Sequence, residues 1–208
     1  MCRMTCSLSL AIKIFALAVV IVTGRYESAH AQETCNTFLA VEINPGDALR
    51  PGGTKTVTLF LGTGKIQGGA NVSVHHVRYD LDCNGDAALA LPCTDQGDVF
   101  SYQGDATIGS TCPGVKWTSN LAAGGHTPNE IVFTPSKPLT IAADTYPYCA
   151  LSFDVKLDRI APTSGPNSDS TPHEVETVAG FLGTDAVCDN GLPSENSQSA
   201  QACAPCVP

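Results

Sequence analysis

The sequence predicts an all-β protein, a single antiparallel β-sandwich of jelly-roll or Ig-like type with disulfides, placed behind an N-terminal signal peptide. Three observations carry this prediction. Apolar and polar residues alternate with a period of two along several short segments, as in strands with one buried face. Gly, Pro and Asn turns separate those segments. The 10 cysteines and an apolar N-terminal segment indicate export to an oxidising compartment.

The strongest strand signal covers residues 149–157, where every second residue is apolar or Cys and the others are Ala or polar. Residues 54–61 behave alike, with Val57, Leu59 and Leu61 on the predicted inner face. The alternation changes phase near His75 and His76, so we expect a β-bulge or a strand break there. Further short strands are expected at residues 38–43, 99–102, 106–111, 130–134, 139–142 and 174–181.

Residues 1–31 have the composition of a cleavable signal peptide. Lys13 precedes an uncharged apolar run at residues 14–22, and Ala29 and Ala31 supply the small residues that a signal peptidase accepts. An uncleaved membrane anchor is the alternative, although the run is shorter than the roughly 20 residues that span a bilayer. We therefore expect the protein to be secreted, either extracellular or periplasmic.

Two segments should follow the signal peptide, a sandwich domain at residues 32–188 and a flexible, Cys-containing tail at residues 189–208. The full chain carries a net charge of −9. Cleavage removes three basic residues and one acidic residue, so the mature chain is more acidic still. Nucleic acids and anionic membranes both need clustered positive charge, so we expect neither as a partner. The oligomeric state is left open.

Eight cysteines remain after cleavage, and an even number in an exported chain predicts disulfides. Many pairings are compatible with eight cysteines. We expect Cys83–Cys93 to close a short loop, and Cys112–Cys149 and Cys35–Cys188 to close longer ones. Cys203 and Cys206 have the spacing of a redox pair, but no helix signal surrounds them, which favours a structural disulfide.

A short acidic segment matches the opening of a calcium-binding loop. Asp80, Asp82 and Asn84 occupy the positions whose side-chain oxygens converge on the ion, and Asp86 would add its backbone carbonyl. Leu91 stands where the bidentate acid of an EF-hand belongs. The alternative is that these residues form a turn after a strand. Ca²⁺ is therefore the candidate cofactor.

Aromatic residues near the strands could form a sugar-binding surface. Phe60 falls on the opposite face from Val57, Leu59 and Leu61. Three more aromatics, Phe100, Tyr102 and Trp117, lie in or beside short strands, although the single Trp of a chain of this size is more often part of the core.

Familiar catalytic motifs are absent from the sequence. There is no G-x-S-x-G elbow, no H-E-x-x-H helix and no phosphate-binding glycine loop. We therefore expect no enzymatic activity. A glycosidase would need only two facing carboxylates, which a sequence of many acidic residues does not reveal, so a secreted hydrolase is kept as an alternative.

Four short motifs occur in the order found in cohesin-type domains and related carbohydrate-module-like β-sandwiches. They are NPGD at residues 44–47, TVTL at 56–59, VRYD at 77–80 and ALSFDV at 150–155. The chain resembles that group over roughly residues 40–160. The resemblance implies a jelly-roll sandwich used for non-catalytic extracellular binding. Cohesins are usually poor in cysteine, and this chain departs from them there.

Three functional hypotheses follow. The first is a secreted, non-catalytic binding or surface-assembly module that holds an extracellular protein or a carbohydrate. The second is a calcium- and disulfide-stabilised structural domain outside the cell. The third is a secreted hydrolase.

Overall fold

The computed structural model describes residues 35, 37–43, 51–64, 70–83, 99–126, 130–159, 174–194 and 196–203. The side chains of residues 38, 82, 83, 174–177 and 196–203 are outside this description. All described residues belong to one unit of the chain, residues 33–208. The expected signal peptide at residues 1–31 therefore lies outside the described residues. Among the described residues, no helix has the length and hydropathy needed to cross a membrane.

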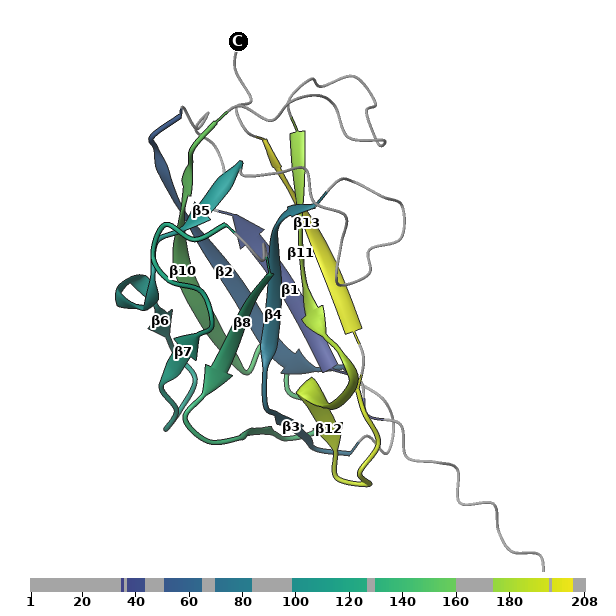
Figure 1. Cartoon of the computed structure of the whole chain (residues 1–208). Coiled ribbons are helices and arrows are strands. Elements are labelled where there is room, and N and C mark those ends of the chain that lie inside the picture. Colours follow the sequence, from purple (N-terminus) through teal and green to yellow (C-terminus); the bar gives the residue numbers. More distant parts are fainter. Residues whose placement is uncertain are drawn as a thin grey trace, which may run out of the picture. The chain divides into compact units, whose positions relative to one another are not determined.

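Antiparallel strands form three sheets (Figure 1). Sheet A contains, in spatial order, β1 (Thr37–Ile43), β2 (Thr54–Thr63), β10 (Cys149–Leu157) and β5 (Phe100–Tyr102), with β6 (Gly109–Ser110) also paired to β10. Sheet C contains β13 (Asn196–Cys203), β11 (Glu174–Phe181), β4 (Val77–Cys83), β8 (Glu130–Pro135) and β7 (Trp117–Ser119). The small sheet B contains β12 (Ala186–Cys188), β3 (Val72–Val74) and β9 (Leu139–Ile141). Two 3-10 turns complete the described elements, η1 (Asp105–Thr107) and η2 (Gly183–Asp185).

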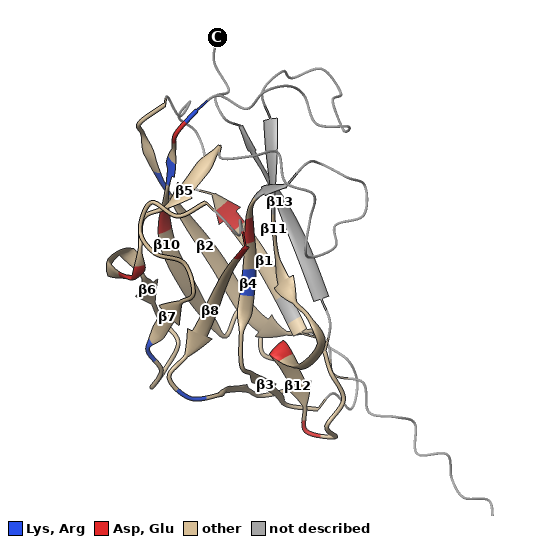
Figure 2. Cartoon of the chain, viewed as in Figure 1, with Lys and Arg blue, Asp and Glu red and all other residues tan. Residues whose placement is uncertain are grey.

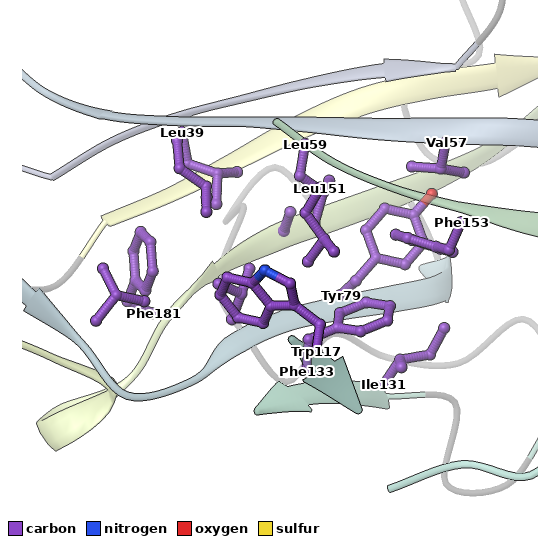
Figure 3. Close-up of a cluster of buried hydrophobic side chains, with 14 of the residues drawn as sticks. Leu39, Val57, Leu59, Tyr79, Trp117, Ile131, Phe133, Leu151, Phe153 and Phe181 are labelled. Carbon is purple, nitrogen blue, oxygen red and sulfur yellow. The ribbon is translucent and has the colours of Figure 1, made fainter. Parts of the chain in front are cut away.

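Sheets A and C pack face to face, which confirms the predicted β-sandwich. Phe153 of β10 contacts aromatic rings from the opposite sheet, with centroid distances of 5.0 Å to Tyr79 and 4.7 Å to Phe133. Figure 3 shows these rings between the two layers, with Leu59 and Leu151 beside them. Such edge-to-face and tilted contacts add to the hydrophobic stabilisation of the buried area.

The two strongest strand predictions are confirmed. In β10 the burial alternates residue by residue along all of Cys149–Leu157, because successive side chains of a strand point to opposite faces. Val57, Leu59 and Leu61 of β2 are fully buried, as predicted. The prediction of a strand at residues 106–111 holds only for Gly109–Ser110, which form β6. Most of that segment is the turn η1 and its exit, where the Thr107 hydroxyl donates to the carbonyl of Gly104 at 2.8 Å.

The expected interruption at His75 and His76 is also present. There the chain leaves β3 in sheet B and enters β4 in sheet C. The two backbone N–H groups donate to the carbonyl of Asp185, at 2.7 Å from His75 and 3.1 Å from His76. Because Asp185 satisfies both groups, neither strand needs to continue through the break.

Sheets A and C contact each other along both lateral edges, and among the described residues no backbone ladder joins them there. On one side β1 lies beside β13. On the other, the carboxylate of Asp105 accepts hydrogen bonds from the hydroxyl of Tyr102 in β5 (2.9 Å) and from the backbone N–H of Ser119 in β7 (3.1 Å). Burial alone would raise the pKa of Asp105, but the hydrogen bonds from Ser119 and Tyr102 lower it overall.

The C-terminal region differs from the prediction of a flexible tail at residues 189–208. Residues 196–203 form β13, which pairs with β11 from Glu174↔Cys203 to Phe181↔Asn196. The segment lacks the apolar alternation on which the prediction depended. An edge strand needs only backbone hydrogen bonds on one side, so a polar sequence can occupy it.

Disulfides connect distant parts of the fold. Cys35 is bonded to Cys188 in β12, and Cys112, just after β6, is bonded to Cys149 at the start of β10. These are two of the three pairings expected from the sequence. The third, Cys83–Cys93, lies outside the described residues. Near the first bond, the backbone N–H of Thr37 donates to the hydroxyl of the buried Ser194 at 3.1 Å.

Candidate binding face on sheet A

The acidic segment expected to bind calcium lies at the end of β4. Asp80 is 3% exposed and lies within the strand, opposite Glu130 of β8 and Val178 of β11. A register shift between β4 and β11 follows it, which is a β-bulge. The side chain of Asp82, and all of Asn84 and Asp86, lie outside the described residues. Among the side chains that are described, no group of three His, Cys, Asp or Glu residues is arranged to hold a metal ion.

An ion-pair cluster lies around Arg78 on the side of sheet C away from the core. Figure 2 shows a basic segment of β4 in blue, with acidic positions in red. The guanidinium donates two hydrogen bonds to the carboxylate of Asp185, and a third, of 3.0 Å, to Glu130. The hydrogen bond that Arg78 donates to Asp185 is the largest cause that raises the pKa of Arg78 above its ordinary value. Asp185 also accepts the backbone N–H of Leu182 at 2.9 Å. These three hydrogen bonds of Arg78 are therefore all made within the protein.

We call the outer face of this sheet the C face, after its central residues Arg78, Asp80, Glu130 and Val178. Asp80 and Val178 are both at most 3% exposed, although they alternate with Tyr79 and Ala179 of the core and so lie on the side away from it. One charged group and one apolar group are thus withdrawn from solvent on this face.

The outer face of sheet A is different, and we call it the A face. It is made by the residues of β1, β2 and β10 that alternate with the buried ones. They are Ala40, Glu42, Thr54, Thr56, Thr58, Phe60, Ala150, Ser152, Asp154 and Lys156. Each of these residues is partly or fully exposed. Most are small, so the sheet presents a shallow surface to solvent.

Aromatic residues gather at one end of the A face. Phe60 lies between Ala40 of β1 and Ala150 of β10 in the strand register, so small side chains flank its ring on both sides. Two residues farther along β2 is Gly62, where an added Cβ would come within 2.6 Å of the ring of Tyr146. Tyr146 is 43% exposed. Gly62 thus provides the space in which the ring of Tyr146 lies over the sheet, two residues along β2 from Phe60.

Hydroxyl and carboxylate groups lie directly beside Phe60. Thr58 is the next residue of β2 on this face and is paired in register with Glu42 and Ser152. Neither the hydroxyl of Thr58 nor the carboxylate of Glu42 has a hydrogen-bond partner among the described residues. Ser152 donates a long hydrogen bond of 3.3 Å to the carbonyl of Gly109. This part of the face therefore has polar groups that a ligand could engage.

Charges dominate the opposite end of the sheet. Asp154 accepts a 2.7 Å hydrogen bond from Thr56. Beyond it, Asp158 lies 3.0 Å from the ammonium of Lys156 and 3.4 Å from Nε2 of His126. Burial alone would raise the pKa of Asp158, but hydrogen bonds from Ser101 and Lys156 lower it overall. The A face therefore changes along its length from aromatic to charged.

The sequence identified some of these residues and missed others. Phe60 was placed on the outer face by its phase in the strand, and the structure agrees. Phe100, Tyr102 and Trp117, the other candidates for a surface row, are 2%, 0% and 6% exposed and belong to the core. Tyr146 was missed because it lies in a turn, between the left-handed Asp144 and a cis Pro147, where no periodicity marks it.

Comparisons with known proteins found solved structures of low sequence identity and low structural similarity. No protein-family model matches the chain, and no curated protein matches it. The full-length major pilin SpaD from Corynebacterium diphtheriae is 11% identical, with a TM-score of 0.39 over 79% of this chain and 33% of that one. A cohesin module from a Clostridium perfringens family 33 glycoside hydrolase is 13% identical, with a TM-score of 0.35 over 81% and 97%.

A third similar structure is AvmM, described as catalysing macrocyclization in alchivemycin A biosynthesis, at 8% identity and a TM-score of 0.33 over 78% and 86% of the two chains. The chain thus spans about a third of the pilin's length. Likenesses at these values do not assign a function.

Proposed function

We propose that this protein is an extracellular, non-catalytic binding module that holds its ligand on the A face. The observation that carries the proposal is the contrast between the two outer faces of one sandwich. On the C face, the guanidinium of Arg78 is engaged by Asp185 and Glu130. On the A face, small exposed residues surround Phe60, and neighbouring polar groups have no partner among the described residues.

The location outside the cell is supported by the covalent structure. Two disulfides connect described parts of the fold, and such bonds persist in oxidising compartments. Cys112 and Cys149 are 6% and 5% exposed, which is typical of structural rather than exchanging cysteines. A binding module needs this kind of rigid scaffold, because a preorganised surface loses less entropy when a ligand binds.

The test compares the two faces with one substitution on each. Thr58→Arg places a long charged side chain at the centre of the A face, and Thr118→Arg places the same group on the exposed edge strand β7 of sheet C. The purified mature chain is incubated with washed cells of the source organism, and the retained fraction is measured. We expect Thr58→Arg to reduce retention at least tenfold and Thr118→Arg to retain wild-type binding.

Equal retention of the wild type and both variants would overturn the proposal. Treating the cells with protease beforehand separates the two ligand classes, since a protein ligand is destroyed and a carbohydrate survives.

A calcium-stabilised structural domain is a second proposal, favoured by one observation. Asp80 is buried opposite Glu130, and Oε1 of Glu130 is itself buried without a hydrogen-bond partner. The other oxygen of Glu130 is paired with Arg78, and a cation at the end of β4 would be a partner for Oε1. The calcium dependence of thermal unfolding is its test and is described below.

A further inference from the structure

We infer that the aromatic end of the A face binds a neutral polysaccharide, with pyranose rings lying on Phe60 and Tyr146. This inference rests on the proposed function and specifies its ligand. It depends on the arrangement of four side chains, those of Phe60, Tyr146, Thr58 and Glu42.

The two aromatic rings are spaced along one strand. Phe60 and Gly62 are two residues apart on the same face of β2, a separation of roughly 7 Å. Tyr146 lies against Gly62, so its ring is the neighbour of Phe60 along the strand. Ala40 and Ala150 flank Phe60, and neither is large enough to block a flat ligand. Both aromatic residues therefore lie on the same face of the sheet, close enough for one oligosaccharide to reach both.

Polar groups lie where the rim of a sugar would reach. A pyranose has an apolar C–H surface on its ring and hydroxyl groups around its edge. The ring surface packs on an aromatic face, and the hydroxyls need hydrogen-bond partners. The hydroxyl of Thr58 and the carboxylate of Glu42 face each other in register beside Phe60, and both lack partners among the described residues. A carboxylate accepts hydrogen bonds from two adjacent sugar hydroxyls.

The charge of this end favours an uncharged ligand. Glu42 is the one charged residue in the rows formed by Phe60 and Thr58 with their register partners. An acidic polysaccharide would bring carboxylates toward Glu42 and toward a protein of net charge −9. A neutral polysaccharide meets no such repulsion. Its binding also does not require a charged group of the ligand to lose its hydration without gaining a partner. A protein ligand is the competing outcome of the test.

The experiment measures binding of the mature chain to soluble polysaccharides by affinity electrophoresis and calorimetry. The panel holds neutral polymers (a mixed-linkage β-glucan, a galactomannan and an arabinoxylan) and the acidic polymer polygalacturonate. We expect binding to at least one neutral polymer and none to polygalacturonate. Phe60→Ala and Tyr146→Ala should each weaken that binding about tenfold, and Glu42→Gln severalfold.

Matched controls separate loss of the aromatic rings from loss of the fold. Val132→Ala removes a partly exposed apolar side chain from the C face and should change binding less than twofold. Phe60→Leu keeps an apolar side chain but removes the aromatic ring, so it should bind as weakly as Phe60→Ala while melting near the wild type. Tyr146→Phe keeps the ring and should bind within about threefold of the wild type.

Each outcome is decisive. The inference is wrong if no neutral polymer binds, or if one binds and both aromatic variants bind it as the wild type does. If cells retain the wild type but not Thr58→Arg, and protease treatment of the cells abolishes retention, then the A face binds a protein and only the ligand class is wrong. Release of reducing ends from a bound polymer would identify a hydrolase and overturn the proposed function as well.

Discussion

The two outer faces of this sandwich come from strands of similar length packed on one core, yet they differ in how their polar groups are satisfied. On the C face, Arg78, Glu130 and Asp185 are joined by hydrogen bonds and largely withdrawn from water. On the A face, Thr58 is partly exposed and Glu42 is exposed, and neither has a hydrogen-bond partner among the described residues. A buried charge is tolerated only when it is paired. An exposed polar group is hydrated in the free protein and can exchange that water for a ligand. The comparison therefore supports our proposal that the C face contributes to stability and the A face to recognition.

The largest expected effect comes from breaking the C-face cluster. Asp185→Ala removes the partner of Arg78 and the acceptor for the N–H of Leu182, so we expect a loss of about 3 kcal/mol in the free energy of unfolding, measured by chemical denaturation. Asp154→Asn on the partly exposed A face is the control and should cost less than about 1 kcal/mol. Similar losses for the two variants would remove the distinction between the faces.

In sheet A, a disulfide joins the segment after β6 to the start of β10. Replacing Cys112 and Cys149 together by Ala frees the β6 edge from the start of β10. We expect a loss of about 2–3 kcal/mol in the free energy of unfolding, mainly because the unfolded chain is less restricted. The same variant should bind its ligand more weakly, since β10 carries Ala150 and Ser152. Unchanged stability would show that packing alone holds this edge.

Calcium should act on the end of β4 and leave the A face unaffected. If the acidic segment binds Ca²⁺, millimolar calcium raises the melting temperature, because a ligand that binds only the folded state stabilises it by mass action. Saturation at about 100 times the dissociation constant corresponds to about 2.7 kcal/mol. Asp80→Asn and Asp82→Asn should abolish the shift, while Asp154→Asn should retain it. Melting curves that coincide in calcium and in chelator would exclude the site.

The smallest effect concerns the edge where the two sheets meet through Asp105. Its pKa is lowered in the folded state, so the carboxylate stabilises the fold above its unfolded pKa of about 3.9. That contribution disappears as the pH falls through the lower folded pKa. Asp105→Asn should therefore be less stable than the wild type at pH 7, and the difference should shrink as the pH falls below about 3.9. Denaturation at a series of pH values measures the difference, and a constant difference across the series would contradict it.

Sequence reasoning recovered the parts of the fold that depend on periodicity. The alternation along Cys149–Leu157 placed both faces of β10, and the change of phase at His75 and His76 placed the passage between two sheets. It failed where other forces decide. The edge strand β13 forms through backbone hydrogen bonds, which leave no hydrophobic pattern.

The candidate site was predictable only in part, for the same reason. Phe60 belongs to a periodic strand, so its face could be read from its neighbours. Tyr146 reaches the A face from a turn, because Gly62 leaves space for its ring. Glu42 and Thr58 acquire their relation only through the register of β1 with β2. Such contacts between distant segments are set by the tertiary fold.

The bond between Cys35 and Cys188 has a mechanical consequence. It closes a loop with a sequence separation of 153 residues, which contains every described strand except β13. Tension applied through the chain before Cys35 and after Cys188 is carried by the sulfur–sulfur bond and bypasses the enclosed strands. A force applied to the C-terminal end would separate β13 from β11, and unfolding would stop at the disulfide. An attached ligand on the A face would therefore stay bound to an intact sheet while the molecule is under load.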